Sequence, residues 1–162
     1  MADDKPQQVI LVSTRGKAEL LGKTLSKDNV MTVAWHMPMS FDPKLYGISI
    51  GKNRFSRRLI DDSKVFTINF MAYGMQDKVI YCGQNSGAAV DKFSGAGLTK
   101  EECSHIDCCR IKEASAYMEC EVIDQFETGD HIVYVGKVIK ENTNDDRKRL
   151  LHIGGNKFTS TL

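Results

Sequence analysis

The segment Asn29–Ser56, NVMTVAWHMPMSFDPKLYGISIGKNRFS, is the stretch that decides the fold of this chain. Its first part, Asn29–Trp35, alternates between two faces with the period of two that is typical of a strand. Leu45–Ile50 repeats this alternation and predicts a second strand. Because proline cannot donate a ladder hydrogen bond, Pro38 and Pro43 predict an irregular link between the two strands.

The turn Gly51–Ser56 follows the second strand and predicts the beginning of a helix. It places Arg54 and Ser56 at the first turn, where backbone N–H groups and the helix dipole attract anions. Together with Ser49 and Lys92 these side chains form a candidate phosphate site. The alternative is that they are ordinary solvated surface, since the chain has neither a P-loop nor a GxGxxG motif.

The rest of the chain contains further strand patterns and few helical ones. Arg15–Asp28 is rich in lysine and glycine and predicts an exposed connection or hairpin, while Ser94–Thr99 predicts a loop. Short helices are predicted from Phe55 to Ile60 and from Met75 to Cys82. The other predicted strands are Val9–Thr14, Val65–Phe70, Ala114–Asp124 and His131–Ile139. About six strands without βαβ alternation predict one mostly β domain over residues 1–162, a closed or nearly closed antiparallel barrel.

Composition narrows the class of protein. The chain has 162 residues, 41% apolar and 27% charged, which is typical of a globular domain. A net charge of +1 gives no electrostatic reason to expect a nucleic acid or an anionic membrane as partner. The polar segment Met1–Gln8 does not resemble a signal peptide, and no apolar run is long enough to span a membrane. We therefore expect a soluble, cytoplasmic protein whose five cysteines are reduced thiols.

The cluster Cys103–Cys109 holds three cysteines and one histidine and suggests a metal site at first sight. All four candidate ligands lie within seven residues, and adjacent Cys108 and Cys109 point apart in an extended chain, so ordinary thiols are the better interpretation. No cysteine or histidine has an evident catalytic partner in the sequence. We expect neither a catalytic side chain nor a bound metal, and we keep His131 as a candidate because it follows the Gly129-Asp130 turn.

An ordered set of short motifs adds a family resemblance. It begins with Asn29–Trp35, Ser40–Pro43, Gly47–Ile50, Arg54 and Ser56. It continues through Cys82-Gly83, Ser86-Gly87, Asp91–Phe93, Gly97–Thr99, Glu119-Cys120, Gly129–His131, His152, Gly154-Gly155 and Phe158. The chain thereby resembles the flavin reductase-like family of FMN-binding split barrels, and within that family it is most similar to the flavoredoxins. Each motif is weak alone, but the order and spacing match over most of the chain.

The resemblance implies a six-stranded antiparallel split barrel, a homodimer and non-covalently bound FMN near the subunit interface. Asn29 through Trp35 would line the isoalloxazine, whereas Ser49, Arg54 and Ser56 would hold the phosphate and the ribityl chain. The remaining residues would complete the pocket, some of them across the dimer. The implied cofactor-binding residues are Asn29, Val30, Met31, Thr32, Trp35, Ser49, Ile50, Gly51, Arg54, Ser56, Lys92, His131 and Phe158.

Three functions compete at this point. The first is a flavin or ferric reductase that takes hydride from NADH or NADPH through FMN. The second is a flavoredoxin-like electron carrier that a partner protein reduces. The third is a thiol-rich metal-binding protein with a degenerate flavin fold. Because the chain has no dinucleotide fingerprint, the sequence leaves the electron donor open, and it does not indicate the acceptor or any role for Cys103, Cys108 and Cys109.

Overall fold

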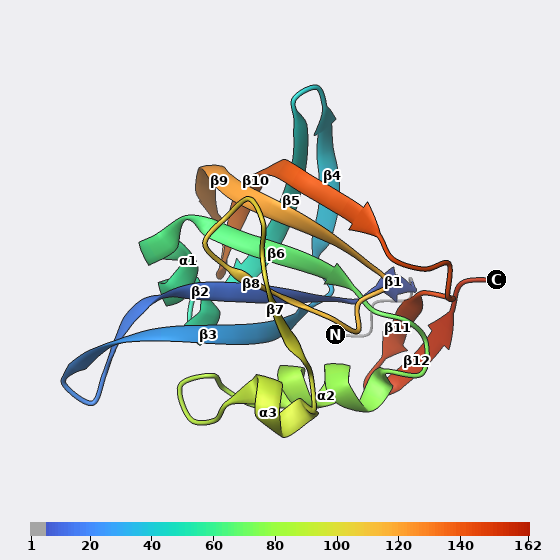
Figure 1. The fold of residues 1–162 in the computed structure, drawn as a ribbon, viewed down its shortest axis with the longest axis horizontal. Helices are drawn as coiled ribbons and strands as arrows, with labels where there is room; N and C mark the ends of the chain where they lie inside the picture. The colour runs from blue at the N-terminus through green and yellow to red at the C-terminus, as the bar shows by residue number, and fades with distance from the viewer. Residues whose placement is uncertain (1–5) are drawn as a thin grey trace.

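A computed structural model describes residues 6–162 and shows a β protein with three short helices (Figure 1). Seven strands form one antiparallel sheet in the order β3-β2-β6-β9-β10-β5-β4. These strands are β2 (Ile10–Leu20), β3 (Lys23–Val33), β4 (His36–Phe41), β5 (Lys44–Gly51), β6 (Val65–Phe70), β9 (Ala116–Thr128) and β10 (His131–Thr143). Within residues 6–162 no strand pairing joins the two edge strands, so the sheet is not closed. The prediction of a mostly β protein with short helices is confirmed.

The central sheet has seven strands rather than the six predicted, because residues around Pro38 form β4 instead of an irregular link. β4 pairs with β5 alone, and its register shifts between Pro38 and Ser40. An edge strand tolerates proline because its outward side needs no ladder donor, and a bulge absorbs the irregularity. The prediction based on the two prolines was therefore wrong at Pro38, whereas Pro43 does lie in the turn between β4 and β5.

The lysine-rich segment after Thr14 continues the first strand and turns back as a hairpin, which confirms the second of the two predicted alternatives. β2 and β3 pair from Ile10 opposite Val33 to Leu20 opposite Lys23. Leu21 and Gly22 make the turn with positive φ angles of 53° and 74°, as a two-residue hairpin loop requires. Both strands are longer than predicted, because the polar part of the hairpin has neighbours that the local sequence does not reveal.

Helix α1 (Phe55–Ser63) supplies one of these neighbours. Ala18 on β2 packs with Phe55 and Leu59 of α1 in a small core cluster. Gly16 lets the helix approach closely, since a Cβ at this position would lie 2.4 Å from the carbonyl oxygen of Leu59. The helix itself begins and packs as predicted, with Phe55, Leu59 and Ile60 buried.

Two larger clusters fill the two sides of the sheet. One lies within the curved sheet and includes Met31, Val33 and Phe66. The other includes Val30 and Leu11, and it packs against helices α2 (Gln76–Gln84) and α3 (Lys92–Ala96), which lie below β3 in Figure 1. The predicted alternation along β3 is confirmed, because neighbouring residues enter different clusters.

Two small sheets complete the structure. The first consists of β1 (Gln7–Gln8), β11 (Leu150–Gly154) and β12 (Lys157–Ser160), and the second of β7 (Lys100–Glu102) and β8 (Cys109–Ile111). Helix α3 occupies Ser94–Ala96 within the predicted loop, and Asp91 caps it by accepting the Ser94 amide at 3.3 Å. Within residues 6–162, no helix has the length and apolar character that crossing a membrane demands.

Candidate functional site

Three adjoining pockets form one groove along β3. The polar pocket, of about 260 Å³, lies between β3, the start of α1 and the segment after α2. The strand pocket, of about 160 Å³, lies at the end of β3 beside β5 and β10. The C-terminal pocket, of about 250 Å³, lies between α2 and the β11–β12 hairpin. Thr32 lines all three pockets, so they belong to one continuous site.

The floor of the polar pocket is the side chain of Asn29, which is 2% exposed. Its amide nitrogen donates to the hydroxyl of Ser56 at 2.8 Å. Its Oδ1 atom is buried without a hydrogen-bond partner, which is costly for a polar atom unless something else fills the pocket. Gly87 faces this oxygen so closely that a Cβ there would lie 2.2 Å from it. The floor of the pocket thus has an unpartnered acceptor, packed against a glycine at a position with no room for a side chain.

Positive charge surrounds the same pocket. Arg54 stands at the N-cap of α1, and no side chain caps the first turn of this helix. Lys92 is 5% exposed and donates to the Cys82 carbonyl at 2.8 Å. The pKa of Lys92 is lowered to about 8, mainly by burial and further by the nearby charges of Arg54 and Lys27, whereas Cys82 acts in the opposite direction. Two nearby cations and a helix N-terminus make this pocket suited to an anion.

The strand pocket presents an aromatic pair at its mouth. The rings of Trp35 and His131 lie 4.6 Å apart with a tilt of 34°. Trp35 remains 51% exposed. The Nδ1 atom of His131 lies 2.6 Å from the carboxylate of Asp130, and this contact holds the pKa of Asp130 below its usual value. An exposed indole beside an imidazole offers a flat, open surface on which a planar ring system can lie.

The C-terminal pocket is more apolar. Phe158 lies against His152 with ring centroids 5.4 Å apart, and Val79 and Gly83 of α2 form the opposite wall. The hydroxyl of Thr32 donates to the carbonyl of Val79 at 2.6 Å, which fixes α2 against β3. The groove therefore changes from cationic and polar at one end to apolar and aromatic at the other.

The structure brings most of the predicted site residues together. The following predicted residues line the groove: Asn29, Met31, Thr32, Trp35, Ser49, Ile50, Gly51, Arg54, Ser56, Lys92, His131 and Phe158. Val30 lines none of the three pockets, because its fully buried side chain packs in the core cluster with Leu11 and Val79. Thr32, on the same face of β3, is only partly buried and lines the groove, so burial rather than side-chain direction sets Val30 apart.

The predicted set leaves out one whole wall of the polar pocket. Cys82 to Gly87 line it at the end of α2 and in the turn that follows, together with Asn53 and Phe55. The run GQNSG in Gly83–Gly87 signals a turn, but nothing local indicates that it faces Asn29.

The cysteine-rich segment forms no part of this groove. In the part of the chain that the structure describes, no group of three or more His, Cys, Asp or Glu side chains is placed to hold a metal ion.

Known proteins resemble the chain over nearly its full length. The family model for the flavin reductase like domain matches residues 2–161. An uncharacterized protein from Archaeoglobus fulgidus is 35% identical over 120 residues, which cover 74% of this chain and 68% of that protein.

Three solved structures share the fold at sequence identities below 25%. The FMN-binding protein from Thermus thermophilus has a TM-score of 0.82 at 24% identity and covers 99% of this chain and 89% of its own. The NADH:FAD oxidoreductase from Streptomyces globisporus C-1027 has a TM-score of 0.82 at 22% identity, over 98% and 88% of the two chains. The flavoredoxin of Desulfovibrio vulgaris (Miyazaki F) has a TM-score of 0.83 at 22% identity, over 96% and 87%. The expected split-barrel fold is thus confirmed, and the chain belongs to the flavin reductase like domain family.

Proposed function

We propose that this protein binds FMN non-covalently in the groove along β3 and passes electrons through it, taking them from NADH or NADPH. The observation that carries this proposal is the unpartnered Oδ1 atom of Asn29 at the floor of a cationic pocket. The phosphate is the only strongly anionic part of FMN, so the positive charge of the polar pocket matches the phosphate end of the cofactor. The family membership and the FMN-binding relative support the assignment.

The residues present fit this cofactor. Arg54, Lys92 and the first turn of α1 would hold the phosphate, since they combine two cations with open backbone donors. The Oδ1 atom of Asn29 would accept a hydrogen bond from a hydroxyl of the ribityl chain. Trp35 and His131 would lie beside the ring system at the mouth of the strand pocket. The change from polar to aromatic along the groove follows the change from phosphate to ring along FMN.

Bound FMN would supply the redox chemistry, and the protein would supply position and electrostatics. Hydride transfer requires no side-chain acid or base, which agrees with a site in which we assign no catalytic residue. Lys92 would stabilise negative charge at the polar end. The half-exposed Trp35 would leave an open approach for the electron donor at the other end. In the proposed reductase activity, NADH or NADPH is the electron donor and a flavin or ferric compound is the acceptor. The first experiment distinguishes this activity from that of a carrier, which a protein donor reduces.

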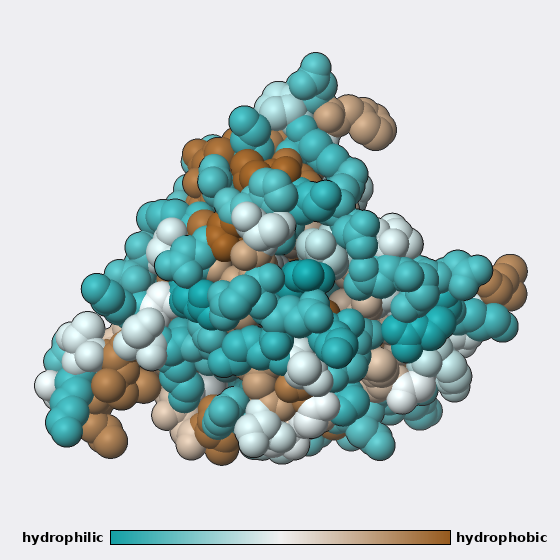
Figure 2. All heavy atoms as spheres, viewed as in Figure 1, coloured by the Kyte–Doolittle hydropathy of each residue, from teal (hydrophilic) through white to brown (hydrophobic). Residues whose placement is uncertain are grey.

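The proposal includes a homodimer in a reducing, cytoplasmic compartment and a single flavin reductase-like domain over residues 1–162. The family match over residues 2–161 supports the single domain, and five unpaired cysteines support the compartment. An apolar pocket of about 680 Å³ supports the dimer, because Trp35, Met37 and Phe126 line it and each is about half exposed. Figure 2 shows apolar colour interrupting the hydrophilic surface over β5, β9 and β10.

The first test is the visible absorption spectrum of the purified protein, followed by anaerobic addition of NADH and then NADPH. We expect a yellow protein whose flavin band bleaches with one of the two nucleotides. A protein that stays yellow until dithionite is added is a carrier that another protein reduces. A colourless protein that fails to take up added FMN would overturn the flavin assignment.

A further inference from the structure

Cys103 and Cys108 stand opposite each other at the end of the β7–β8 pair, outside the flavin groove. The register of this pair runs from Lys100 opposite Ile111 to Glu102 opposite Cys109, so that the next rung joins Cys103 with Cys108. The backbone N–H of Cys103 donates to the carbonyl of Cys108 at 2.9 Å, which shows that the rung is formed. Directly opposed residues of an antiparallel pair have Cα atoms about 5.5 Å apart. A disulfide bridges Cα atoms at this spacing.

The side chains at this rung also meet. The Cys108 thiol lies within hydrogen-bonding reach of the thiols of Cys103 and Cys109, and it donates to the Ser13 carbonyl at 3.7 Å. Burial and these neighbouring thiols raise the pKa of Cys108 well above its usual value. Cys103 and Cys108 share one rung and project to the same face of the pair, whereas Cys109 belongs to the next rung, opposite Glu102. Cys103 and Cys108 are therefore the matched pair.

Access to the solvent differs between the two members of the pair. Cys103 is half-buried, whereas Cys108 and Cys109 have no exposed surface. A reagent in solution therefore reaches Cys103 first, and Cys108 stands behind it.

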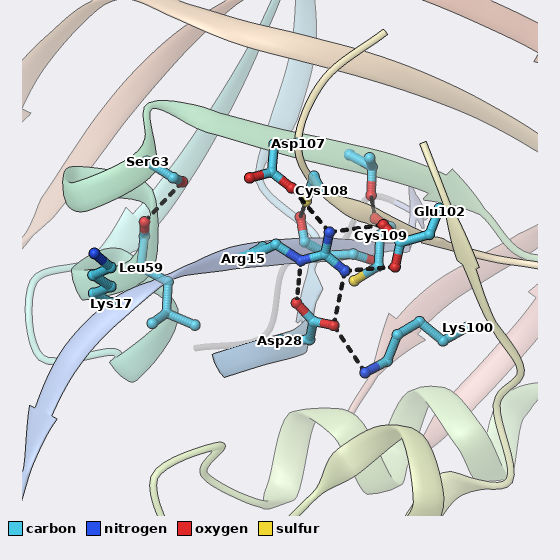
Figure 3. A network of polar contacts seen from close by, with 12 residues as sticks. Arg15, Lys17, Asp28, Leu59, Ser63, Lys100, Glu102, Asp107, Cys108 and Cys109 are labelled. Carbon is cyan, nitrogen blue, oxygen red and sulfur yellow. Dashed lines mark hydrogen bonds and ion pairs between the residues drawn. The ribbon is translucent and has the colours of Figure 1, made fainter. Parts of the chain in front are cut away.

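The loop that contains the pair is held firmly in place. The fully buried carboxylate of Glu119 accepts the backbone N–H groups of Ser104 and His105 at 3.0 and 2.8 Å. Arg15 binds Glu102 at 2.7 Å and Asp107 at 3.0 Å, the residues that immediately precede the two cysteines (Figure 3). Such anchoring keeps the two thiols opposite each other and disfavours other partners for Cys103.

We infer that Cys103 and Cys108 form a thiol–disulfide exchange site that a low-molecular-weight disulfide oxidises. The Cys103 thiolate attacks one sulfur of the incoming disulfide, forms a mixed disulfide and releases one thiol. Cys108 then attacks the Cys103 sulfur and its proton goes to the departing thiolate, which leaves as the second thiol. Two protein thiols lose two electrons, and the small disulfide is reduced to two thiols. The site does not depend on the proposed flavin chemistry.

The test exposes the folded protein to oxidised glutathione, alkylates the remaining thiols and maps the peptides by mass spectrometry. We expect wild-type protein to lose two hydrogens in the peptide that contains Cys103 and Cys108, with no glutathione retained. Cys108→Ser should accumulate one glutathionyl group on Cys103, because the second step is blocked. Cys103→Ser should remain unmodified, because the other four thiols are buried.

Cys109→Ser is the matched control, since it removes an equally buried neighbouring thiol and should leave the bond between Cys103 and Cys108 intact. A serine at position 108 retains a donor toward the Ser13 carbonyl, so we expect this variant to fold. A stable glutathione adduct on wild-type Cys103, a bond from Cys103 to Cys109, or no reaction at all would each overturn the inference. If Cys108→Ser does not fold, the wild-type peptide map and the Cys103→Ser variant still decide it.

Discussion

At the scale of a single residue, Lys92 connects burial with ligand chemistry. It is 5% exposed, and its charge shares the polar pocket with Arg54. Its pKa of about 8 lies below the usual 10.5, so between these two values the unfolded chain binds the proton more strongly than the folded one. Stability of the ligand-free protein therefore rises with pH over this window. An anion in the pocket acts in the opposite direction, because it favours the charged lysine.

Lys92→Met should weaken FMN binding at neutral pH and change how the affinity depends on pH. In the wild type, bound phosphate keeps Lys92 protonated, so that binding takes up a proton above pH 8. The affinity should then fall by up to about tenfold per pH unit above that value. Fluorescence titration of the ligand-free protein with FMN from pH 7 to pH 9.5 measures this slope.

Exposed Lys64→Met is the control, because Lys64 binds Gln125 on the surface and lines none of the three pockets. It should leave both the affinity and the slope unchanged. An unchanged affinity and slope in Lys92→Met would remove this residue from the proposed phosphate site.

At the scale of an element, β10 shows how one glycine permits close packing. The pairing of β10 with β9 shifts register between Val135 and Gly136. A Cβ at Gly136 would lie 2.6 Å from the Phe66 ring and 2.9 Å from Cys120 Cβ. The bulge and the missing side chain together let β10 lie against the centre of the core.

Gly136→Ala should destabilise the protein by about 1–3 kcal/mol, because the added methyl group overpacks a fully buried site. Urea unfolding followed by circular dichroism measures the change. Gly83→Ala on α2 is the matched control, since its Cβ would only touch Thr32 at 3.4 Å and alanine favours a helix. A Gly136→Ala variant as stable as the control would mean that the core yields more readily than these distances indicate.

A second element-scale feature joins two hairpins. Arg15 on β2 binds Asp28 on β3 at 2.7 Å and also reaches the carboxylates of Glu102 and Asp107 (Figure 3). Burial by itself would raise the pKa of Asp28, but Arg15 and Lys100 hold it below its usual value. Arg15→Met should lower the free energy of unfolding by about 2 kcal/mol, because it leaves three carboxylates together without their cation. This value lies between those for exposed and buried ion pairs.

Lys44→Met is the control for this prediction. Lys44 and Glu141 are each nearly half exposed, so their ion pair should contribute less than about 1 kcal/mol. Thermal unfolding at low and high salt compares the two variants. Equal losses in both would contradict a structural role for the Arg15 network.

At the scale of the whole molecule, apolar side chains remain uncovered on one part of the central sheet. Phe126 is 47% exposed and Met37 58% exposed, and both line the apolar pocket beside Trp35. Removing such apolar area from water by covering it with a second surface stabilises the association. The proposed homodimer would bury it next to the mouth of the flavin groove.

Phe126→Glu should convert the dimer into a monomer, because it places a charge within the apolar surface. Sedimentation velocity of wild-type protein and variant measures the mass directly. Leu21→Glu, at the fully exposed tip of the β2–β3 hairpin, should leave the dimer intact. A wild-type protein that sediments as a monomer at micromolar concentration would refute the dimer.

The sequence by itself determined those features that depend on neighbours along the chain. Alternation predicted the strand at Leu45–Ile50 and the two faces of β3, whose residues enter different clusters, and helical spacing predicted the buried face of α1. The helix start with Arg54 and Ser56 was evident in the same way. These features follow from periods of two and 3.6 residues, which local sequence records directly.

Only the tertiary structure decided features that depend on contacts between distant segments. It placed Gly87 against Asn29, and it set Cys103 opposite Cys108. It also showed that Pro38 lies in an edge strand and that polar β2 continues beneath α1. Strand partners and pocket walls are chosen by the packing of the whole chain, because pairing energies arise between residues far apart in sequence and leave no local periodicity.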